Sequence, residues 1–178
     1  TSSGYVNTIQ NIGKVQNKGF ELTLDARVLT GEFKWNVNAN ISFNRNKVKK
    51  LYGGEDIFGG KVNAVIVNDE TNILREGYPI GQFWGYVEDG YDEKGQIIFK
   101  DLKEDGTINK EDKTFIGDPN PDFIYGLTSN MSFKNFELNL FFQGSQGNDL
   151  FNASAISNTM DYGYGLNMPK DVFNNHWT

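Results

Sequence analysis

Residues 33–43 read FKWNVNANISF, and this stretch alternates between apolar and polar side chains without a break. The odd positions carry Phe, Trp, Val, Ala, Ile and Phe, whereas the even positions carry Lys, three Asn and Ser. Successive side chains of a β-strand point to opposite faces. The period of two therefore predicts a strand with one apolar and one polar face.

Three neighbouring segments show the same alternation and complete two predicted hairpins. The first hairpin turns at 30–32, which contains Gly31, and the second turns at Lys134-Asn135. Short turns of this kind join antiparallel strands. The predicted strands are 18–29, 33–46, 122–133 and 135–144. The chain is therefore expected to be all-β, with an antiparallel meander.

The length of these strands favours a membrane barrel over a soluble sheet. Strands of soluble proteins are usually about 5–6 residues long. Ten steps from Phe33 to Phe43 span ~33 Å, and a tilt of ~40° projects this length to ~25 Å, the height of the apolar band on outer-membrane barrels. Alternation alone leaves a second interpretation open, in which a soluble antiparallel sheet covers a core. Four strands cannot close a barrel, so the membrane interpretation predicts that the chain is a fragment or combines with other chains.

The connections between the strands are strongly asymmetric. Both hairpin turns are short, whereas 47–121 is one long connection and 145–178 is a Gly- and Asn-rich tail. The region 47–120 holds 15 of the 23 acidic residues. Outer-membrane barrels have short turns on one side and long loops on the other. The pattern therefore predicts a long loop at 47–121 and a further loop at 145–178.

Composition excludes several functional classes. The net charge of −6 argues against a nucleic-acid binder. The chain has no Cys and one His, His176, so thiolate metal sites and multi-histidine metal sites are not expected. Carboxylate pairs such as Glu88/Asp89 are interpreted as solvated surface. We therefore predict no catalytic residues and no enzyme activity.

Four motifs resemble the SusC/RagA family of TonB-dependent outer-membrane transporters. They are NKGFE at 17–21, EGYPIGQFWGY at 76–86, DLKEDGTINKED at 101–112 and IGDPNPDFIYG at 116–126. The stretches FQGS at 142–145 and WT at 177–178 also resemble the family. Together these elements occur in the family's order and cover nearly the whole chain. The resemblance implies that residues 1–178 are part of one large transmembrane β-barrel, with 47–121 as a long extracellular loop.

The resemblance also implies a function, partners and a location. It implies energy-coupled import of glycans or peptides through the outer membrane of the cell. The implied partners are a SusD-like surface lipoprotein, outer-membrane lipid, and the TonB complex, which would be reached through N-terminal parts outside this sequence. The alternative from the residues alone is a soluble β-sandwich that binds carbohydrate or calcium.

The acidic stretch 101–112 is a candidate calcium site. It matches the calcium-loop template at positions 1, 5, 6, 8, 9 and 12, where oxygen ligands surround a Gly that permits a sharp turn. The candidate ligands are Asp101, Asp105, Thr107, Asn109 and Asp112. Lys103 stands where a ligand is expected, and the last ligand is Asp in place of the longer Glu. The other interpretation is a solvated acidic turn, and no other cofactor is predicted.

Three aromatic residues, Phe83, Trp84 and Tyr86, form a candidate ligand-binding group. Aromatic faces stack on sugar rings and on peptide side chains. In a transporter, these rings would contact cargo or the surface lipoprotein that covers the barrel as a lid. The other interpretation is that they anchor the loop by packing against the rest of the receptor.

Overall fold

The computed structural model describes residues 13–63, 68–159 and 167–175, and His176 lies outside these ranges. The chain divides into two compact units. Unit 1 comprises 1–57, 74–80 and 120–148, and unit 2 comprises 58–73, 81–119 and 149–178.

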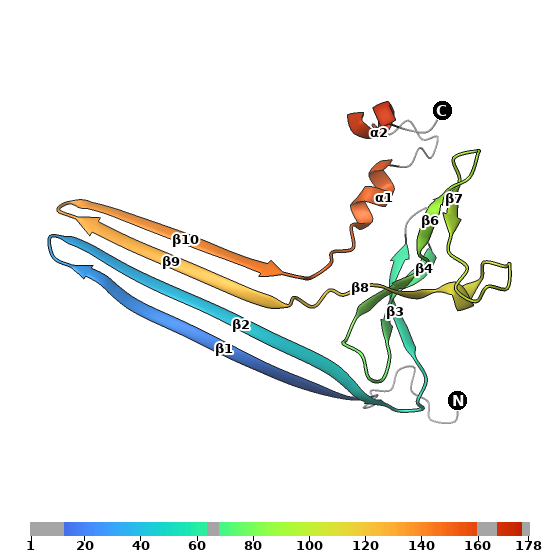
Figure 1. The fold of residues 1–178 in the computed structure, drawn as a ribbon, viewed down its shortest axis with the longest axis horizontal. Helices are drawn as coiled ribbons and strands as arrows, with labels where there is room; N and C mark the ends of the chain where they lie inside the picture. The colour runs from blue at the N-terminus through green and yellow to red at the C-terminus, as the bar shows by residue number, and fades with distance from the viewer. Residues whose placement is uncertain (1–12, 64–67, 160–166, 176–178) are drawn as a thin grey trace, which may run out of the picture. The chain divides into compact units, whose positions relative to one another are not determined.

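Unit 1 contains a four-stranded antiparallel sheet (Figure 1). Its strands are β1 (Gly13–Thr30), β2 (Phe33–Leu51), β9 (Phe123–Phe133) and β10 (Phe136–Gln146), in the order β1-β2-β9-β10. The two hairpins pair through β2 and β9, which are joined by the long connection. Both β1 and β2 extend beyond the bounds expected from the sequence, to Gly13 and Leu51, because residues at their shared end continue the pairing past a register shift at Lys14/Val15.

The sheet has one apolar and one polar face, as its register shows. Directly opposite residues of an antiparallel pair have side chains on the same face. Phe20 pairs with Phe43, Leu24 with Ala39, and Leu127 also with Ala39, so their side chains share the apolar face. The polar face carries the Asn residues of β2.

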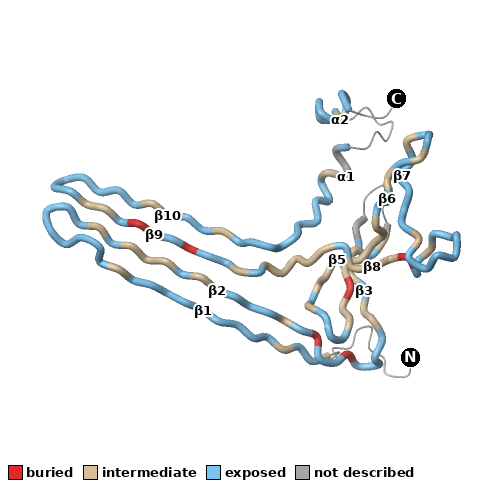
Figure 2. Tube along the Cα trace, viewed as in Figure 1, coloured by how far each residue is buried: buried red, intermediate tan, exposed pale blue. Residues whose placement is uncertain are grey.

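Few apolar side chains are buried in the described part of the chain. Val48, Leu51 and Ile73 are the buried apolar residues there, whereas Phe20 is 62% exposed and Leu24 is 58% exposed. Figure 2 accordingly shows exposed residues along most of β1 and β10. The described residues of unit 1 form a single sheet, with no second sheet stacked on its apolar face. Unit 1 alone therefore lacks the two-layer core of a β-sandwich.

One polar pair lies on the apolar face. The Trp35 indole N–H donates a 2.9 Å hydrogen bond to Ser129 Oγ on the neighbouring strand. Ser129 is buried beneath this contact. The bond gives the indole N–H an acceptor on a face whose other neighbouring side chains are apolar.

Unit 2 is built from short strands. One sheet has the order β3-β4-β5-β8 and another pairs β6 with β7. The bounds are β3 Ile57–Asn63, β4 Asn68–Leu74, β5 Gln82–Gly85, β6 Glu88–Tyr91, β7 Ile97–Phe99 and β8 Thr114–Gly117. The connection expected as one long loop at 47–121 thus contains six short strands in addition to the end of β2. Their lengths of 3–7 residues leave too little periodicity to recognise in the sequence.

The described residues of unit 2 also form three short helices. They are the 3₁₀ helix η1 (Lys110–Asp112), α1 (Ala153–Thr159) and α2 (Lys170–Asn175). The last two lie in the tail expected as a loop at 145–178. No helix in the described ranges combines the length and apolar character needed to span a bilayer.

Candidate functional site

The candidate aromatic residues lie on and just after β5, which pairs with β8. Trp84 pairs with Phe115, and their rings meet edge to face with centroids 5.3 Å apart. The Phe83 ring lies 6.1 Å from that of Phe151, and the Tyr86 ring lies 5.2 Å from that of Phe99. Each of the three candidates therefore packs against another ring of unit 2, and both binding and anchoring against the barrel or plug stay predictions.

Trp84 alone of the three also lines a cavity of about 160 Å³. The walls of this cavity combine aromatic rings with charges of both signs. Its lining residues are Phe58, Asp69, Glu70, Trp84, Lys110 and Lys113. Apart from Trp84, these residues could not be recognised in the sequence, because they come from β3, β4, η1 and the residue between η1 and β8, with no shared spacing. The cavity can accept a small polar group against an aromatic wall.

A charge pair sits in this wall. The Lys113 ammonium donates to Asp69 Oδ2 and lies over the Tyr86 ring, 5.2 Å from its centroid. The Lys113 side chain is 9% exposed, so Asp69 and the Tyr86 ring take the place of much of the water around its ammonium group. The hydrogen bond from Lys113 lowers the pKa of Asp69, against the opposing effect of burial. The Asp69 carboxyl therefore stays ionised at neutral pH.

The acidic stretch 101–112 folds around its own backbone amides. Asp101 Oδ2 accepts from Gly106 N at 2.7 Å, and its Oδ1 accepts from Lys103 N at 3.1 Å. Asp105 Oδ1 accepts from Thr107 N at 2.9 Å. Gly106 has a φ of 79°, in the left-handed region that favours glycine. The turn residue expected from the calcium template thus takes the conformation that gathers these carboxylates.

Asp112 closes this loop and is fully buried. Its Oδ2 accepts from Asn109 N at 2.9 Å, and its Oδ1 accepts from Leu102 N at 2.9 Å and Lys103 N at 3.2 Å. Asn109 in turn caps η1 by accepting from Glu111 N at 2.8 Å. The amide of Asn109 is the main cause that lowers the pKa of Asp112, with further help from those of Lys103 and Leu102 and against the effect of burial.

No group of three or more His, Cys, Asp or Glu residues in the described ranges is arranged to hold a metal ion. The oxygens of Asp101 and Asp112 instead accept hydrogen bonds from backbone amides. Asp101, Asp105, Thr107, Asn109 and Asp112 therefore lie in one loop, as the template requires, and calcium binding to them stays a prediction.

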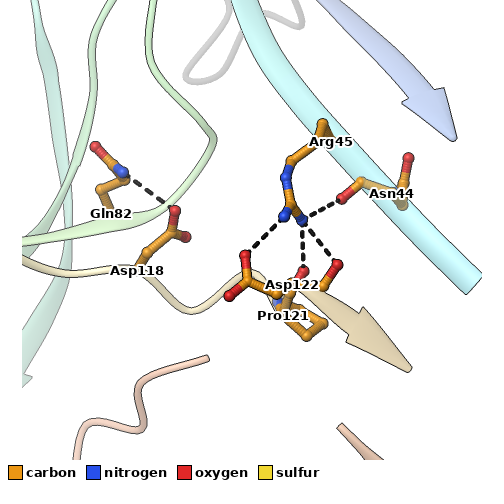
Figure 3. A network of polar contacts seen from close by, with 6 residues as sticks. All are labelled: Asn44, Arg45, Gln82, Asp118, Pro121 and Asp122. Carbon is orange, nitrogen blue, oxygen red and sulfur yellow. Dashed lines mark hydrogen bonds and ion pairs between the residues drawn. The ribbon is translucent and has the colours of Figure 1, made fainter. Parts of the chain in front are cut away.

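A second polar cluster joins the strands of unit 1 at the end that bears the long connection (Figure 3). The Arg45 guanidinium donates to Asp122 Oδ1 at 2.6 Å and to the backbone carbonyls of Asp122 and Pro121 at 3.0 and 3.1 Å. These bonds tie β2 to the start of β9. Figure 3 also shows the contact in unit 2 between Gln82 Nε2 and Asp118 Oδ2, at 3.2 Å.

The segment 74–80 is fixed to the same end of the sheet. Asn46 Oδ1 accepts from Ile80 N at 2.6 Å, while Asn120 Nδ2 donates to Ile80 O at 2.9 Å. Asn46 Nδ2 also donates to Asn120 Oδ1 at 2.6 Å. Further along, Glu76 Oε1 accepts from Leu51 N at 2.6 Å. The EGYPIG motif therefore serves here to join the long connection to β2.

No family model matches the chain. It is 38% identical over 171 residues to TonB-dependent receptor P3 of Formosa agariphila, covering 86% of this chain and 17% of that receptor. It is 33% identical over 150 residues to TonB-dependent receptor SusC of Bacteroides thetaiotaomicron, covering 80% of this chain and 15% of that receptor. The chain thus spans about one sixth of the length of these relatives.

Solved structures agree with these relatives at the level of the fold. A structure of the RagAB peptide transporter matches with a TM-score of 0.62 and 22% identity, over 80% of this chain and 16% of that one. The RagAB peptide importer in its open-open state matches with a TM-score of 0.63 and 21% identity, over 83% of this chain and 16% of that one. Solved structures therefore already contain the fold of the antiparallel sheets described above.

Proposed function

Because the chain is homologous to a segment of the SusC/RagA-type TonB-dependent receptors, we propose that its four long strands form part of the wall of an outer-membrane β-barrel importer. The importer would take up glycans or peptides with energy from the TonB complex. It would work with a SusD-like lipoprotein at the cell surface. No covalent chemistry is involved.

One observation carries this proposal: the apolar face of the unit 1 sheet is exposed along its length. Five large apolar side chains on this face are between 51% and 62% exposed: Phe20, Leu22, Leu24, Leu138 and Phe142. In water such a surface would drive association. Acyl chains cover an apolar face without this cost, and lipid-facing and lumen-facing residues alternate along barrel strands.

The sheet edges support the same proposal. β1 and β10 each pair with one strand among the described residues, so their outer edges have free backbone groups. Backbone groups in a bilayer must all be hydrogen-bonded, which requires a closed barrel. The remaining strands would come from other parts of the receptor.

The proposal assigns the long connection 47–121 to the cell surface. The turns at 31–32 and 134–135 lie at one end of the sheet, and the long connection leaves from the other. Short turns face the periplasm in outer-membrane barrels. Phe83, Trp84 and Tyr86 would then lie outside the cell, with the aromatic cavity beside Trp84 as a candidate contact for cargo or for the lipoprotein lid.

The relatives indicate only the class of compound that the importer would carry. The solved structures with this fold are described as a peptide transporter and importer, RagAB. The family resemblance also includes glycans. The Asn-rich polar face of β2 is suited to neutral cargo of either kind, because amides donate and accept hydrogen bonds without net charge.

Spin labels on adjacent residues of β1 test the membrane proposal. The chain has no Cys, so single cysteines can be introduced into a full-length receptor whose other cysteines have been removed. In liposomes, labels at Leu22 and Leu24 should collide more with oxygen, which partitions into lipid, than with a water-soluble nickel complex. Labels at Thr23 and Asp25 should show the reverse preference. Equal accessibility at all four positions would exclude a barrel wall.

Uptake by cells tests the transport proposal. Cells that depend on the receptor should accumulate labelled oligosaccharide or oligopeptide, and lose this uptake when the receptor or TonB is deleted. The class of compound whose uptake is lost identifies the cargo. Unchanged uptake of both classes would contradict a role as their importer.

A further inference from the structure

Cations gather in two strand segments that pair with each other. Residues 13–20 and 43–51 contain no Asp or Glu, although the chain as a whole has a net charge of −6. These segments hold six of its 17 Lys and Arg residues. All six are exposed: Lys14, Lys18, Arg45, Lys47, Lys49 and Lys50.

The register places at least five of these cations on one face. Lys18 pairs with Arg45, and this pair lies two positions beyond Phe20 and Phe43. Residues two apart in a strand share a face, as do directly opposite residues. Lys47 therefore follows on the same face.

The register shift near Lys14 adds the last pair to this face. Lys49 is left without a partner there, and Lys14 pairs with Lys50. The side chains of Lys14 and Lys50 thus lie on the same face as those of Lys18 and Lys47. The apolar face of the sheet continues directly into a cationic patch, defined here as Lys14, Lys18, Arg45, Lys47 and Lys50.

Most of this charge is not neutralised within unit 1. Arg45 forms an ion pair with Asp122. Within the described part of the chain, the ion pairs are Arg45–Asp122, Arg75–Asp56 and Lys113–Asp69, so the four lysines of the patch have no acidic partner. Lysines held together on one face favour an anionic partner, because it relieves their mutual repulsion.

The inner end of the patch lies at the height of lipid headgroups. Phe20 and Phe43 mark the edge of the apolar band. With a rise of ~3.3 Å per residue and a tilt of ~40°, Lys18 and Arg45 lie ~5 Å above that edge, Lys47 lies ~10 Å above it, and Lys14 and Lys50 lie ~15 Å above it. The headgroup layer occupies roughly the first 5–8 Å outside the hydrocarbon.

The other end of the sheet lacks such a patch. Its turns carry Glu32 and Lys134, which are opposite in charge. Positive charge is therefore concentrated at the end of the sheet that bears the long connection. The proposed function assigns this end to the outer leaflet.

We propose that the cationic patch binds the phosphorylated headgroup of an outer-leaflet lipid. This inference rests on the proposed function, because the patch meets lipid only if the apolar face does. Lysine ammonium groups recognise phosphate as point charges. Each lysine beside an anionic headgroup strengthens binding by roughly fivefold, so three together contribute roughly a hundredfold.

Native mass spectrometry of the full-length receptor in detergent tests this site. The probes are purified lipid A carrying its phosphate, the same lipid after enzymatic dephosphorylation, and inorganic phosphate. Wild-type receptor should retain the phosphorylated lipid in preference to the dephosphorylated one. The variant K14Q/K18Q/K47Q should lose at least tenfold in affinity for the phosphorylated lipid, and binding should weaken as salt is raised.

Matched variants separate the patch from general charge effects. K34Q/K94Q/K100Q removes the same number of cations from exposed positions outside the patch and should bind as wild type does. K14R/K18R/K47R keeps the charge and should retain binding even if the glutamine variant folds poorly. Equal lipid affinity of the glutamine variant and wild type would overturn the proposal, as would displacement of the lipid by inorganic phosphate at equal concentration.

The spin-label experiment distinguishes this failure from failure of the proposed function. If labels at Leu22 and Leu24 face lipid but the patch variants bind lipid normally, the headgroup site alone is wrong. If those labels face water, the barrel proposal fails and the headgroup site fails with it.

Discussion

The sheet of unit 1 and the short strands of unit 2 are stabilised in different ways. The unit 1 strands run for 11–19 residues with regular pairing and an exposed apolar face. The unit 2 strands run for 3–7 residues, and side chains such as Asp101 and Asp112 hold the turns between them through backbone amides. Unit 1 leaves its apolar face exposed, whereas unit 2 combines local polar contacts with packing between aromatic rings.

This difference indicates where each unit is sensitive to mutation. An apolar surface that contacts lipid tolerates change of shape but not the addition of charge. A loop closed by buried carboxylates tolerates neither loss of charge nor loss of an acceptor, because each freed amide is left without a partner. We therefore test unit 1 by adding charge to its apolar face, and unit 2 by removing charge from its acidic loop.

The largest effect is expected for Leu24→Arg, near the middle of the apolar face. Placing Arg at the midplane of a barrel's lipid face costs about 2–4 kcal/mol. The full-length receptor should therefore show less folded protein in the membrane, measured by its heat-modifiable mobility on gels, and a lower midpoint in urea.

Thr23→Arg is the matched control for this prediction. Thr23 is adjacent to Leu24 but lies on the polar face, where it pairs with Asn40. Arg should be tolerated there because water reaches that face. If both variants are equally destabilised, or neither is, the two faces of β1 do not meet different media.

The next largest effect is expected for Asp112→Asn in the acidic loop. Asparagine keeps one acceptor oxygen but replaces the other with an amide that donates, so the amides of Leu102 and Lys103 or that of Asn109 lose their partner. Hydrogen exchange of these amides in the full-length receptor should accelerate roughly thirtyfold as the loop opens more often. Asp105→Asn should have little effect, because Asp105 accepts only from Thr107 in this loop.

The pH dependence of the same loop follows from the lowered pKa of Asp112. A carboxyl with a lowered pKa in the folded state contributes stability above its ordinary value of 3.8. That contribution is lost as pH falls from 3.8 through the lowered value. Protection of the loop, corrected for the intrinsic exchange rate, should be constant from neutral pH to about pH 5 and decline below pH 4. A decline centred near pH 6 would contradict a role for Asp112.

The long strands of unit 1 could be predicted because each carries many repeats of one simple pattern. Eleven alternating residues around Val37 define a face without any tertiary information. The ends of these strands could not be predicted, since β1 and β2 pass a register shift where the alternation breaks and Lys49 has no partner.

The cavity of unit 2 could not be predicted for a different reason. Asp69 and Lys113 are 44 residues apart and meet only when β4, β5 and β8 pair. The acidic loop was recognisable because its hydrogen bonds join residues close in sequence, from Asp101 to Gly106 and from Asn109 to Asp112. Local contacts leave a signal in the sequence, whereas contacts between distant strands of three or four residues leave none.

The calcium hypothesis predicts a smaller change in the same loop. With free calcium at ten times its Kd, binding would protect the loop by about tenfold, or about 1.4 kcal/mol. Hydrogen exchange of residues 101–112 should then accelerate by this factor when a chelator is added. The double variant D101N/D105N should abolish the difference. Equal exchange with millimolar calcium and with chelator would favour the solvated acidic turn.

The smallest effect is expected at Lys134, in the turn between β9 and β10. Lys134 has a φ of 53°, a left-handed conformation that costs residues with a Cβ about 1 kcal/mol. Glycine at this position should therefore be more stable than alanine by about 1 kcal/mol, reversing the usual order, since both variants lose the contact of the Lys134 ammonium with the Phe133 ring. At Asn135, which does not have a positive φ, alanine should be the more stable of the two. Urea unfolding of the four full-length variants measures this, and a preference for alanine at position 134 would contradict the left-handed turn.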